Sequence, residues 1–213
     1  LDNVIVVLSR TTEPMNIGAT CRAMKTMGLK HLRLIDPINP KGRSSRALAH
    51  GAEEILQNAV VVDDVIEAVS DALVVTGTTA RTRKLRKRAL LTPSQLGDQI
   101  ADHSRSGKVV IMFGTERTGM TNDETDLCRY LSTVDTAPEQ PSLNLAQAVM
   151  ILAYEWWMAA EATPPRYLMT NETHVATKGE LDIFLGRLIA ELDASGFLDN
   201  QEKRPGMVRN LRH

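Results

Sequence analysis

The sequence predicts an α/β fold in which a mostly parallel sheet carries helices on both faces. Two observations support this fold. Short β-branched runs alternate with segments whose apolar residues recur at helical spacing, and several of these segments are preceded by helix-start signals. Such alternation is typical of parallel sheets, because each crossover helix packs back onto the sheet. The expected strands are residues 4–8, 31–35, 59–62, 72–76, 109–113 and 131–135.

Capping residues predict where the helices begin and end. Thr92 precedes Pro93, with Gln95 as the third helical residue, which predicts a helix to about residue 103. Residues 121–124 and 177–180 have the same Thr-x-x-Glu pattern, and the second predicts a helix ending at Gly196. Gly28 stands where a left-handed residue ends the helix expected over 16–27. Short helices are expected over 44–50, 52–56 and 64–70, and a long apolar helix over 144–162.

Length and composition suit one α/β domain with an appendage. The chain has 213 residues, of which 43% are apolar and 24% charged, as in ordinary globular proteins. A break at residues 163–165 predicts a main domain over 1–162 and a linker with a helical extension over 163–213. No apolar run is long enough to span a bilayer, and two cysteines form no disulfide framework, so a cytoplasmic protein is expected. The histidines are scattered, so no metal site is expected.

Basic residues are concentrated in two places although the net charge is −1. One run holds six basic residues in eight positions: Arg81, Arg83, Lys84, Arg86, Lys87 and Arg88. A second group lies near the end: Lys203, Arg204, Arg209 and Arg212. Either group is compatible with a solvated loop or tail, but the density of the first favours a nucleic-acid partner.

Unusual residues occur in four loops that follow expected strands, at 16–22, 77–81, 114–119 and 138–144. Because the carboxyl ends of parallel strands share one edge, these loops predict a ligand site there. Each residue also has a simpler interpretation: Asn16 as a helix cap, Arg22 as a surface residue, Gly114 and Gly119 as turn glycines, Thr78 and Thr79 as strand-end residues, and Ser142 or Asn144 as the cap of the long helix. The set as a whole favours a site.

Several enzyme classes lose support because their motifs are missing. The sequence has no G-x-G-x-x-G, no G-x-x-x-x-G-K-[ST] and no G-x-S-x-G. Dinucleotide-binding dehydrogenases, P-loop nucleotide triphosphatases, ordinary Rossmann-type methyltransferases and α/β-hydrolases are therefore disfavoured.

Three ordered motifs resemble those of the SpoU/TrmH-type RNA 2′-O-ribose methyltransferases of the SPOUT superfamily, and the wider text is most similar to the TrmJ-like tRNA methyltransferases. The motifs are Asn16-Ile-Gly-x-x-x-Arg22, Phe113-Gly-x-Glu-x-x-Gly119 and Ser142-Leu-Asn-Leu145. The resemblance covers residues 3 to about 160. It implies a trefoil knot near the end of the catalytic domain, a homodimer, S-adenosylmethionine as the cofactor, and methylation of a tRNA ribose at the first nucleotide of the anticodon loop. The long helix agrees with a dimer, because it is apolar on two faces and needs two burial partners.

The resemblance also implies roles for individual residues. The cofactor would lie against Thr78, Thr79, Ala80, Gly114, Val134, Pro141, Ser142 and Leu143. Arg22 would be the central catalytic residue with its guanidinium held by Glu116, while Asn16, Ser142 and Asn144 would orient the substrate or the arginine. The run from Arg81 to Arg88 would contact RNA. Pro141 is a departure that removes one backbone N–H from the cofactor loop.

Other functions also agree with parts of the sequence. The same chemistry on ribosomal RNA, a non-catalytic RNA-binding protein on the same scaffold, and a nucleotide-binding α/β protein with another ligand all fit parts of the pattern. The role of Arg22 is also open between proton abstraction and charge stabilisation, because arginine is effectively always protonated.

Overall fold

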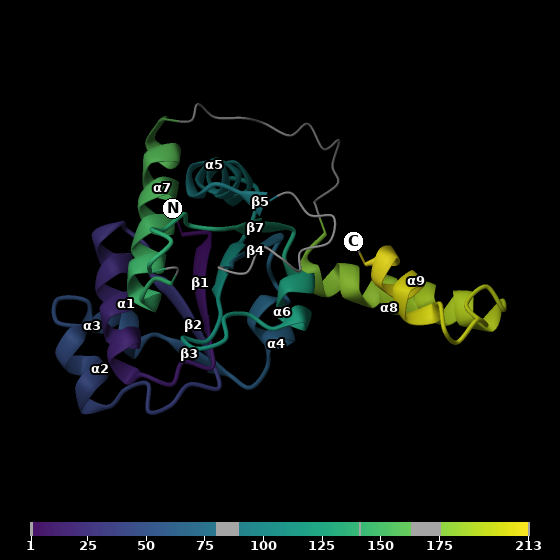
Figure 1. The fold of residues 1–213 in the computed structure, drawn as a ribbon, viewed down its shortest axis with the longest axis horizontal. Coiled ribbons are helices and arrows are strands. Elements are labelled where there is room, and N and C mark those ends of the chain that lie inside the picture. The colour runs from purple at the N-terminus through teal and green to yellow at the C-terminus, as the bar shows by residue number, and fades with distance from the viewer. Residues whose placement is uncertain (1, 80–89, 141, 163–175, 213) are drawn as a thin grey trace.

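The computed structural model describes residues 2–79, 90–140, 142–162 and 176–212. Its centre is a seven-stranded sheet in the order β3-β2-β1-β6-β4-β7-β5 (Figure 1). Every strand pairing is parallel, so the expected mostly parallel sheet is confirmed in a stricter form. The strands are β1 (Val4–Ser9), β2 (His31–Ile35), β3 (Val60–Val62), β4 (Val74–Thr78), β5 (Leu90–Leu91), β6 (Val109–Phe113) and β7 (Tyr130–Ser132).

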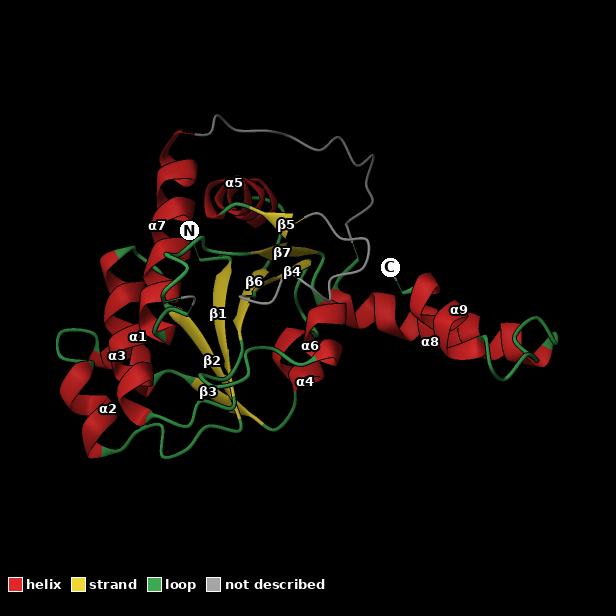
Figure 2. Cartoon of the chain, viewed as in Figure 1, coloured by secondary structure: helices red, strands yellow, loops and turns green. Residues whose placement is uncertain are grey.

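Helices cover both faces of this sheet, as Figure 2 shows. Side chains of β1 alternate between two apolar cores, with Val4, Val6 and Leu8 in one and Ile5 and Val7 in the other. The first core lies under α1 (Pro14–Thr26), α2 (Arg43–Leu48), α3 (Glu53–Gln57), α5 (Pro93–Ser104) and α7 (Leu145–Ala162). The second lies under α4 (Val65–Val69) and α6 (Asn122–Leu127). Because both faces are covered, β1 is buried along its whole length.

Most of the predicted helix ends are confirmed. Thr92, Thr121 and Thr177 each form a capping box with the Gln or Glu three residues later. Gly28 has φ +71° and follows α1, where Leu29 N donates to Met24 O at 2.9 Å. The simpler interpretation of Asn16 is wrong, because Glu13 caps α1 and Pro14 is its first residue. Asn16 thus lies inside the first turn, and its side chain is available for another role.

α7 finds its two burial partners within one chain. It packs between α1 and α5, and Trp156 is fully buried. α5 approaches α7 so closely that a Cβ on Gly97 would lie 2.7 Å from the carbonyl carbon of Glu155. The two apolar faces of α7 therefore do not by themselves require a second subunit. Tyr154 and Met158 remain about half exposed on the outer side, at 47% and 48%.

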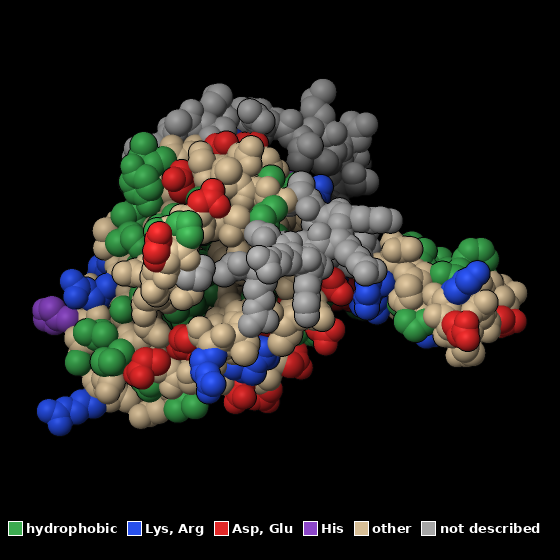
Figure 3. Space-filling model, in the orientation of Figure 1, with side chains coloured by type: hydrophobic (Ala, Val, Ile, Leu, Met, Phe, Trp, Pro, Cys, Tyr) green, Lys and Arg blue, Asp and Glu red, His purple; other side chains and the backbone are tan. Residues whose placement is uncertain are grey.

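The C-terminal extension consists of α8 (Lys178–Ala194) and α9 (Arg204–Leu211), which project from the body as an arm. The first amides of α8 bind the sheet domain, with Lys178 N donating to Ala72 O at 2.7 Å and Gly179 N to Ser70 O at 2.6 Å. Large apolar side chains are exposed on this arm (Figure 3), among them Ile183, Phe184 and Phe197. Among the described helices, none combines the length and apolarity that crossing a membrane requires.

Two elements were not expected from the sequence. β5 has only two residues, too few for a periodic pattern. α9 buries none of its residues, so its sequence lacks the apolar stripe that would have predicted a helix. The strand expected over 131–135 is also shorter, since β7 ends at Ser132.

Candidate active site

A cavity of about 360 Å³ lies at the carboxyl ends of β4, β6 and β7 and beside the start of α7. Every described residue that was predicted to bind the cofactor lines it: Thr78, Thr79, Gly114, Val134, Ser142 and Leu143. Ala80 and Pro141 lie outside the described residues. The strand-end loops therefore gather as the parallel topology requires.

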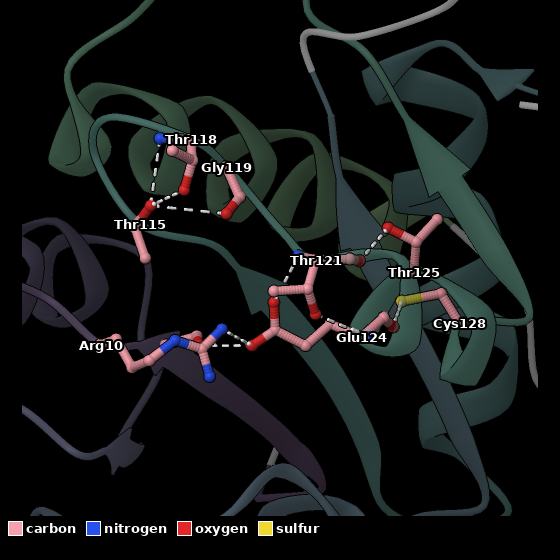
Figure 4. A network of polar contacts seen from close by, with 9 residues as sticks. Arg10, Thr115, Thr118, Gly119, Thr121, Glu124, Thr125 and Cys128 are labelled. Atoms are coloured by element: carbon pink, nitrogen blue, oxygen red, sulfur yellow. Dashed lines mark hydrogen bonds and ion pairs between the residues drawn. The ribbon is translucent and has the colours of Figure 1, made fainter. Parts of the chain in front are cut away.

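The 114–119 loop is a tight hairpin that forms one wall of this cavity. Thr115 and Gly119 exchange backbone hydrogen bonds of 3.2 and 2.9 Å, and the hydroxyls of Thr115 and Thr118 lie 2.7 Å apart (Figure 4). Gly119 has φ +68°, a conformation that favours glycine. A Cβ on Gly114 would lie 2.1 Å from the backbone of Gly119 and Met120. Gly119 is thus a turn glycine, whereas Gly114 is needed for close approach of two backbone segments.

Glu116 projects from this hairpin to the loop before α1. Its Oε1 accepts from Asn16 Nδ2 at 3.1 Å and from Glu13 N at 3.2 Å, and its Oε2 accepts from Thr12 N at 3.2 Å. Burial by itself raises the pKa of Glu116, but the hydrogen bonds from Asn16 and the backbone amides outweigh burial and hold its pKa below the usual value. Glu116 is therefore ionised at neutral pH and serves as a hydrogen-bond acceptor.

Asn144 joins the third motif to the first. Its Nδ2 donates to Asn16 Oδ1 at 2.8 Å, and its Oδ1 accepts from Ala146 N at 2.9 Å in the first turn of α7. Asn144 thus caps α7, as one simpler interpretation held, and also contacts Asn16. Asn16 is buried, and it connects Glu116 with Asn144 across 100 and 128 residues of chain.

Arg22 is placed differently from the expectation. It is exposed on α1 and does not line the cavity, and the described ion pairs include none between Arg22 and Glu116. Within the single chain, the described partners of Glu116 thus do not include the guanidinium of Arg22, and the expected contact between them stays a prediction. The physical reason is helical geometry, because six residues at about 100° each leave Arg22 about 120° around the helix from Asn16.

Other cavity and network residues carried no signal in the sequence. Thr12 and Glu13 donate their backbone amides to Glu116, and the hydroxyl of Thr12 also donates to Glu116 at 3.2 Å. Arg117, Met120, Thr136 and Ala148 also line the cavity. No motif specifies these residue types. Arg117 lies inside the second motif, but at a position where the motif allows any residue.

The structure describes only one of the two groups of basic residues. The run from Arg81 to Arg88 lies outside the described residues, so its contact with RNA stays a prediction. In the terminal group, Arg204 pairs with Asp193 at 2.5 Å, Arg209 with Asp126 at 3.7 Å and Arg212 with Asp182 at 3.8 Å. These arginines tie the C-terminal helices together and to α6, so intramolecular pairing accounts for most of this group.

A larger cavity, about 790 Å³, separates α4 and α6 from the C-terminal helices and is lined by none of the predicted site residues. In the described ranges, no three His, Cys, Asp or Glu side chains form a group that could hold a metal ion.

Comparisons with known proteins agree with the motifs. The model of the SpoU rRNA Methylase family matches residues 3–154. The tRNA (cytidine/uridine-2'-O-)-methyltransferase TrmJ of Cronobacter sakazakii is 37% identical over 213 residues, covering 99% of this chain and 86% of its own length. TrmJ of Escherichia coli K12 is 38% identical over 212 residues, covering 99% of this chain and 85% of its own length.

Solved structures give the same result. The crystal structure of TrmJ from Z. mobilis ZM4 superposes with a TM-score of 0.78 at 38% identity, covering 98% of this chain and 88% of that one. A probable methylase family protein from Haemophilus influenzae has a TM-score of 0.73 at 36% identity, covering 99% and 86% of the two chains. The chain therefore belongs to the SpoU methylase family.

Proposed function

We propose that this protein transfers a methyl group from S-adenosylmethionine to a ribose 2′-hydroxyl of tRNA, at the first nucleotide of the anticodon loop. One observation carries the proposal: the cavity and the Asn16–Glu116–Asn144 network bring the three motifs together at one edge of the sheet. The relatives that match almost the whole chain are named as tRNA 2′-O-methyltransferases, which supports tRNA over ribosomal RNA.

The cavity suits the cofactor in its chemistry. Gly114 has no Cβ, so the backbone segments of the hairpin that forms one wall can approach closely, and Thr78 and Thr79 line the same cavity with small side chains. Together with Val134, Ser142 and Leu143, they would hold S-adenosylmethionine, which supplies an electrophilic methyl group when bound. The residues of the chain must then place the ribose oxygen in line with that methyl group, since positioning provides much of the acceleration.

Charge stabilisation is the role we assign to Arg22. A 2′-hydroxyl is a very weak acid, and a guanidinium stays protonated, so Arg22 is suited to bind the developing negative charge or an adjacent phosphate. Asn16 and Asn144 would orient the substrate, because their amides are fixed by Glu116 and by the first turn of α7.

A homodimer would resolve the position of Arg22. This side chain is exposed on α1 and lies outside the cavity of its own chain, so we propose that it acts at the cavity of a second subunit. We also propose, from the family, that residues 1–162 form a knotted catalytic domain, that residues 163–213 form a separate extension, and that the enzyme works in the cytoplasm.

The decisive experiment is mass spectrometry of nucleosides after incubation of the chain with labelled S-adenosylmethionine and either unmodified tRNA or ribosomal RNA. Label in a 2′-O-methylated nucleoside of the anticodon loop is the expected result. Label only in ribosomal RNA would reject the tRNA assignment, and no label in either RNA would reject the enzyme.

Arg22→Ala is expected to abolish methylation while leaving calorimetric binding of S-adenosylmethionine nearly intact. Arg46→Ala, which changes another exposed arginine on the neighbouring α2, is the control. Full turnover by Arg22→Ala would remove Arg22 from the mechanism.

Mixed dimers test whether subunits share a site. Arg22→Ala mixed with Gly114→Trp, which distorts the hairpin wall of the cavity, should regain activity if each dimer then combines one intact cavity with one intact Arg22. Activity no higher than the sum of the separate variants would contradict a shared site.

Neutralising Arg83, Lys84, Arg86 and Lys87 with glutamine tests the basic run. RNA affinity should fall and its dependence on salt should flatten, because fewer counterions are released on binding. An unchanged salt dependence would mean that the basic run does not contact RNA and is an ordinary solvated loop.

A further inference from the structure

Arg10 lies at the carboxyl end of β1, where a buried carboxylate holds its guanidinium (Figure 4). Arg10 Nη2 donates to Glu124 Oε1 at 2.6 Å. The side chain of Glu124 is 2% exposed, whereas that of Arg10 is 38% exposed. One nitrogen of the guanidinium is thus fixed in the protein, while a substantial part of the side chain remains accessible.

The helix-capping role of Glu124 rests on hydrogen bonds other than the one from Arg10. Its Oε2 accepts from Thr121 N at 2.7 Å, which completes the capping box of α6, and its Oε1 also accepts from the hydroxyl of Ser9 at 2.5 Å. The bond to Arg10 therefore neutralises the buried carboxylate and holds the guanidinium in one orientation. Within the described ranges, no second side-chain partner of this guanidinium is recorded.

The backbone at Arg10 is also unusual. Its φ is +46°, in the left-handed region that glycine or asparagine adopts at lower cost, and its N–H donates to Ile35 O at 2.7 Å. An arginine in this conformation points to a use for its side chain, since strained residues tend to occur at functional sites.

Strand register places Arg10 beside the candidate active site. β1 pairs with β6 such that Leu8 lies opposite Phe113, so the chain leaves β1 next to the start of the 114–119 hairpin. The residues that follow, Thr12 and Glu13, donate their amides to Glu116. Arg10 thus belongs to the loop that positions Glu116, on the edge of the sheet where RNA must approach the cavity.

We propose that Arg10 binds a backbone phosphate of the RNA whose ribose is methylated. This inference rests on the proposed function. A guanidinium offers several N–H donors in a planar fork that matches phosphate oxygens, and only one nitrogen is occupied by Glu124. Because Glu124 orders the side chain before RNA arrives, little conformational freedom is lost on binding.

The test measures the affinity of the full chain for an unmodified tRNA transcript at several salt concentrations, with S-adenosylhomocysteine present to prevent turnover. Arg10→Gln should weaken binding about tenfold and flatten the slope of log affinity against log salt by about 0.7 to 1, the effect of one lost phosphate contact. Arg10→Lys should keep the slope, because the charge remains. Circular dichroism at the assay temperature establishes that each variant is folded.

Arg105→Gln is the matched control. Arg105 pairs with Asp102 at 3.3 Å but precedes β6, so it lies at the opposite edge of the sheet. A merely structural Arg10 would change thermal stability and leave the salt slope untouched, and a folded Arg10→Gln variant with the parental slope overturns the proposal. The proposed function fails separately, if the parental chain neither binds nor methylates tRNA.

Discussion

Replacing Asn16 by alanine removes two hydrogen bonds that connect the three motifs. One is charge-assisted, from Asn16 Nδ2 to Glu116 at 3.1 Å, and the other is neutral, from Asn144 Nδ2 to Asn16 Oδ1 at 2.8 Å. A bond to a charged acceptor contributes about 1.5–3 kcal/mol and a neutral one about 1 kcal/mol. Alanine regains about 0.5 kcal/mol of helix propensity, and water can replace part of the bond to the half-buried Glu116.

The expected loss is therefore near the lower end, about 2 kcal/mol, which corresponds to about 4–8 °C in Tm for a domain of this size. Differential scanning calorimetry measures it. Asn122→Ala is the control, because Asn122 also lies in the first turn of a helix but is exposed. A variant as stable as the parent at neutral pH would refute the view that Asn16 holds the motifs together.

The same variant has a characteristic pH dependence. The pKa of Glu116 is lower in the folded protein than in the unfolded chain, because its hydrogen bonds, Asn16 included, outweigh the effect of burial. The stability that this carboxylate contributes is therefore present above its unfolded pKa and is lost as the pH falls through its lower folded pKa. The gap between parent and Asn16→Ala should narrow in acid, and a gap that widens there would assign the effect to other groups.

Three further predictions follow from the described contacts. Gly114→Ala should cost about 1–3 kcal/mol and weaken binding of S-adenosylmethionine, because its Cβ would lie 2.1 Å from the hairpin backbone; Gly186→Ala, where the added methyl meets nothing within 4 Å, is the control, and equal effects in calorimetry would contradict this reasoning. Asp71→Asn should destabilise the protein by about 1–2 kcal/mol at neutral pH, because hydrogen bonds from Arg33 and Lys108 hold the pKa of Asp71 well below its usual range. This difference should narrow as the pH falls below the usual pKa of aspartate toward the low folded pKa of Asp71, and a difference in denaturant midpoints that stays constant over that range would point to packing instead. Burial raises the pKa of Cys21 to about 12, so iodoacetamide at about pH 8 should modify Cys21 only after unfolding, and rapid alkylation of the folded protein, followed by mass spectrometry, would contradict the burial.

The sequence by itself predicted the features that depend on residues close together in the chain. Thr92, Thr121 and Thr177 cap helices because a side-chain oxygen and a Gln or Glu three residues later satisfy free amides wherever they occur. β6 was predicted with its observed bounds, since a fully apolar β-branched run has few alternatives to a buried strand. The parallel arrangement then followed from alternation, and with it the edge at which the cavity lies.

Contacts between distant segments were not readable in this way. Asn16 meets Glu116 and Asn144 only because β1 and β6 are neighbours in the sheet and α7 packs against α1. The sequence cannot indicate that the amides of Thr12 and Glu13 bind Glu116, since every residue type except proline has such an amide. It also does not indicate the left-handed conformation of Arg10, which depends on how the chain leaves β1. Arg22 is the clearest example. Its motif predicts a catalytic residue, but the direction of its side chain depends on which face of α1 the fold buries. Hydrogen bonding within one turn is set by neighbours in sequence, whereas packing across the sheet is set by neighbours in space.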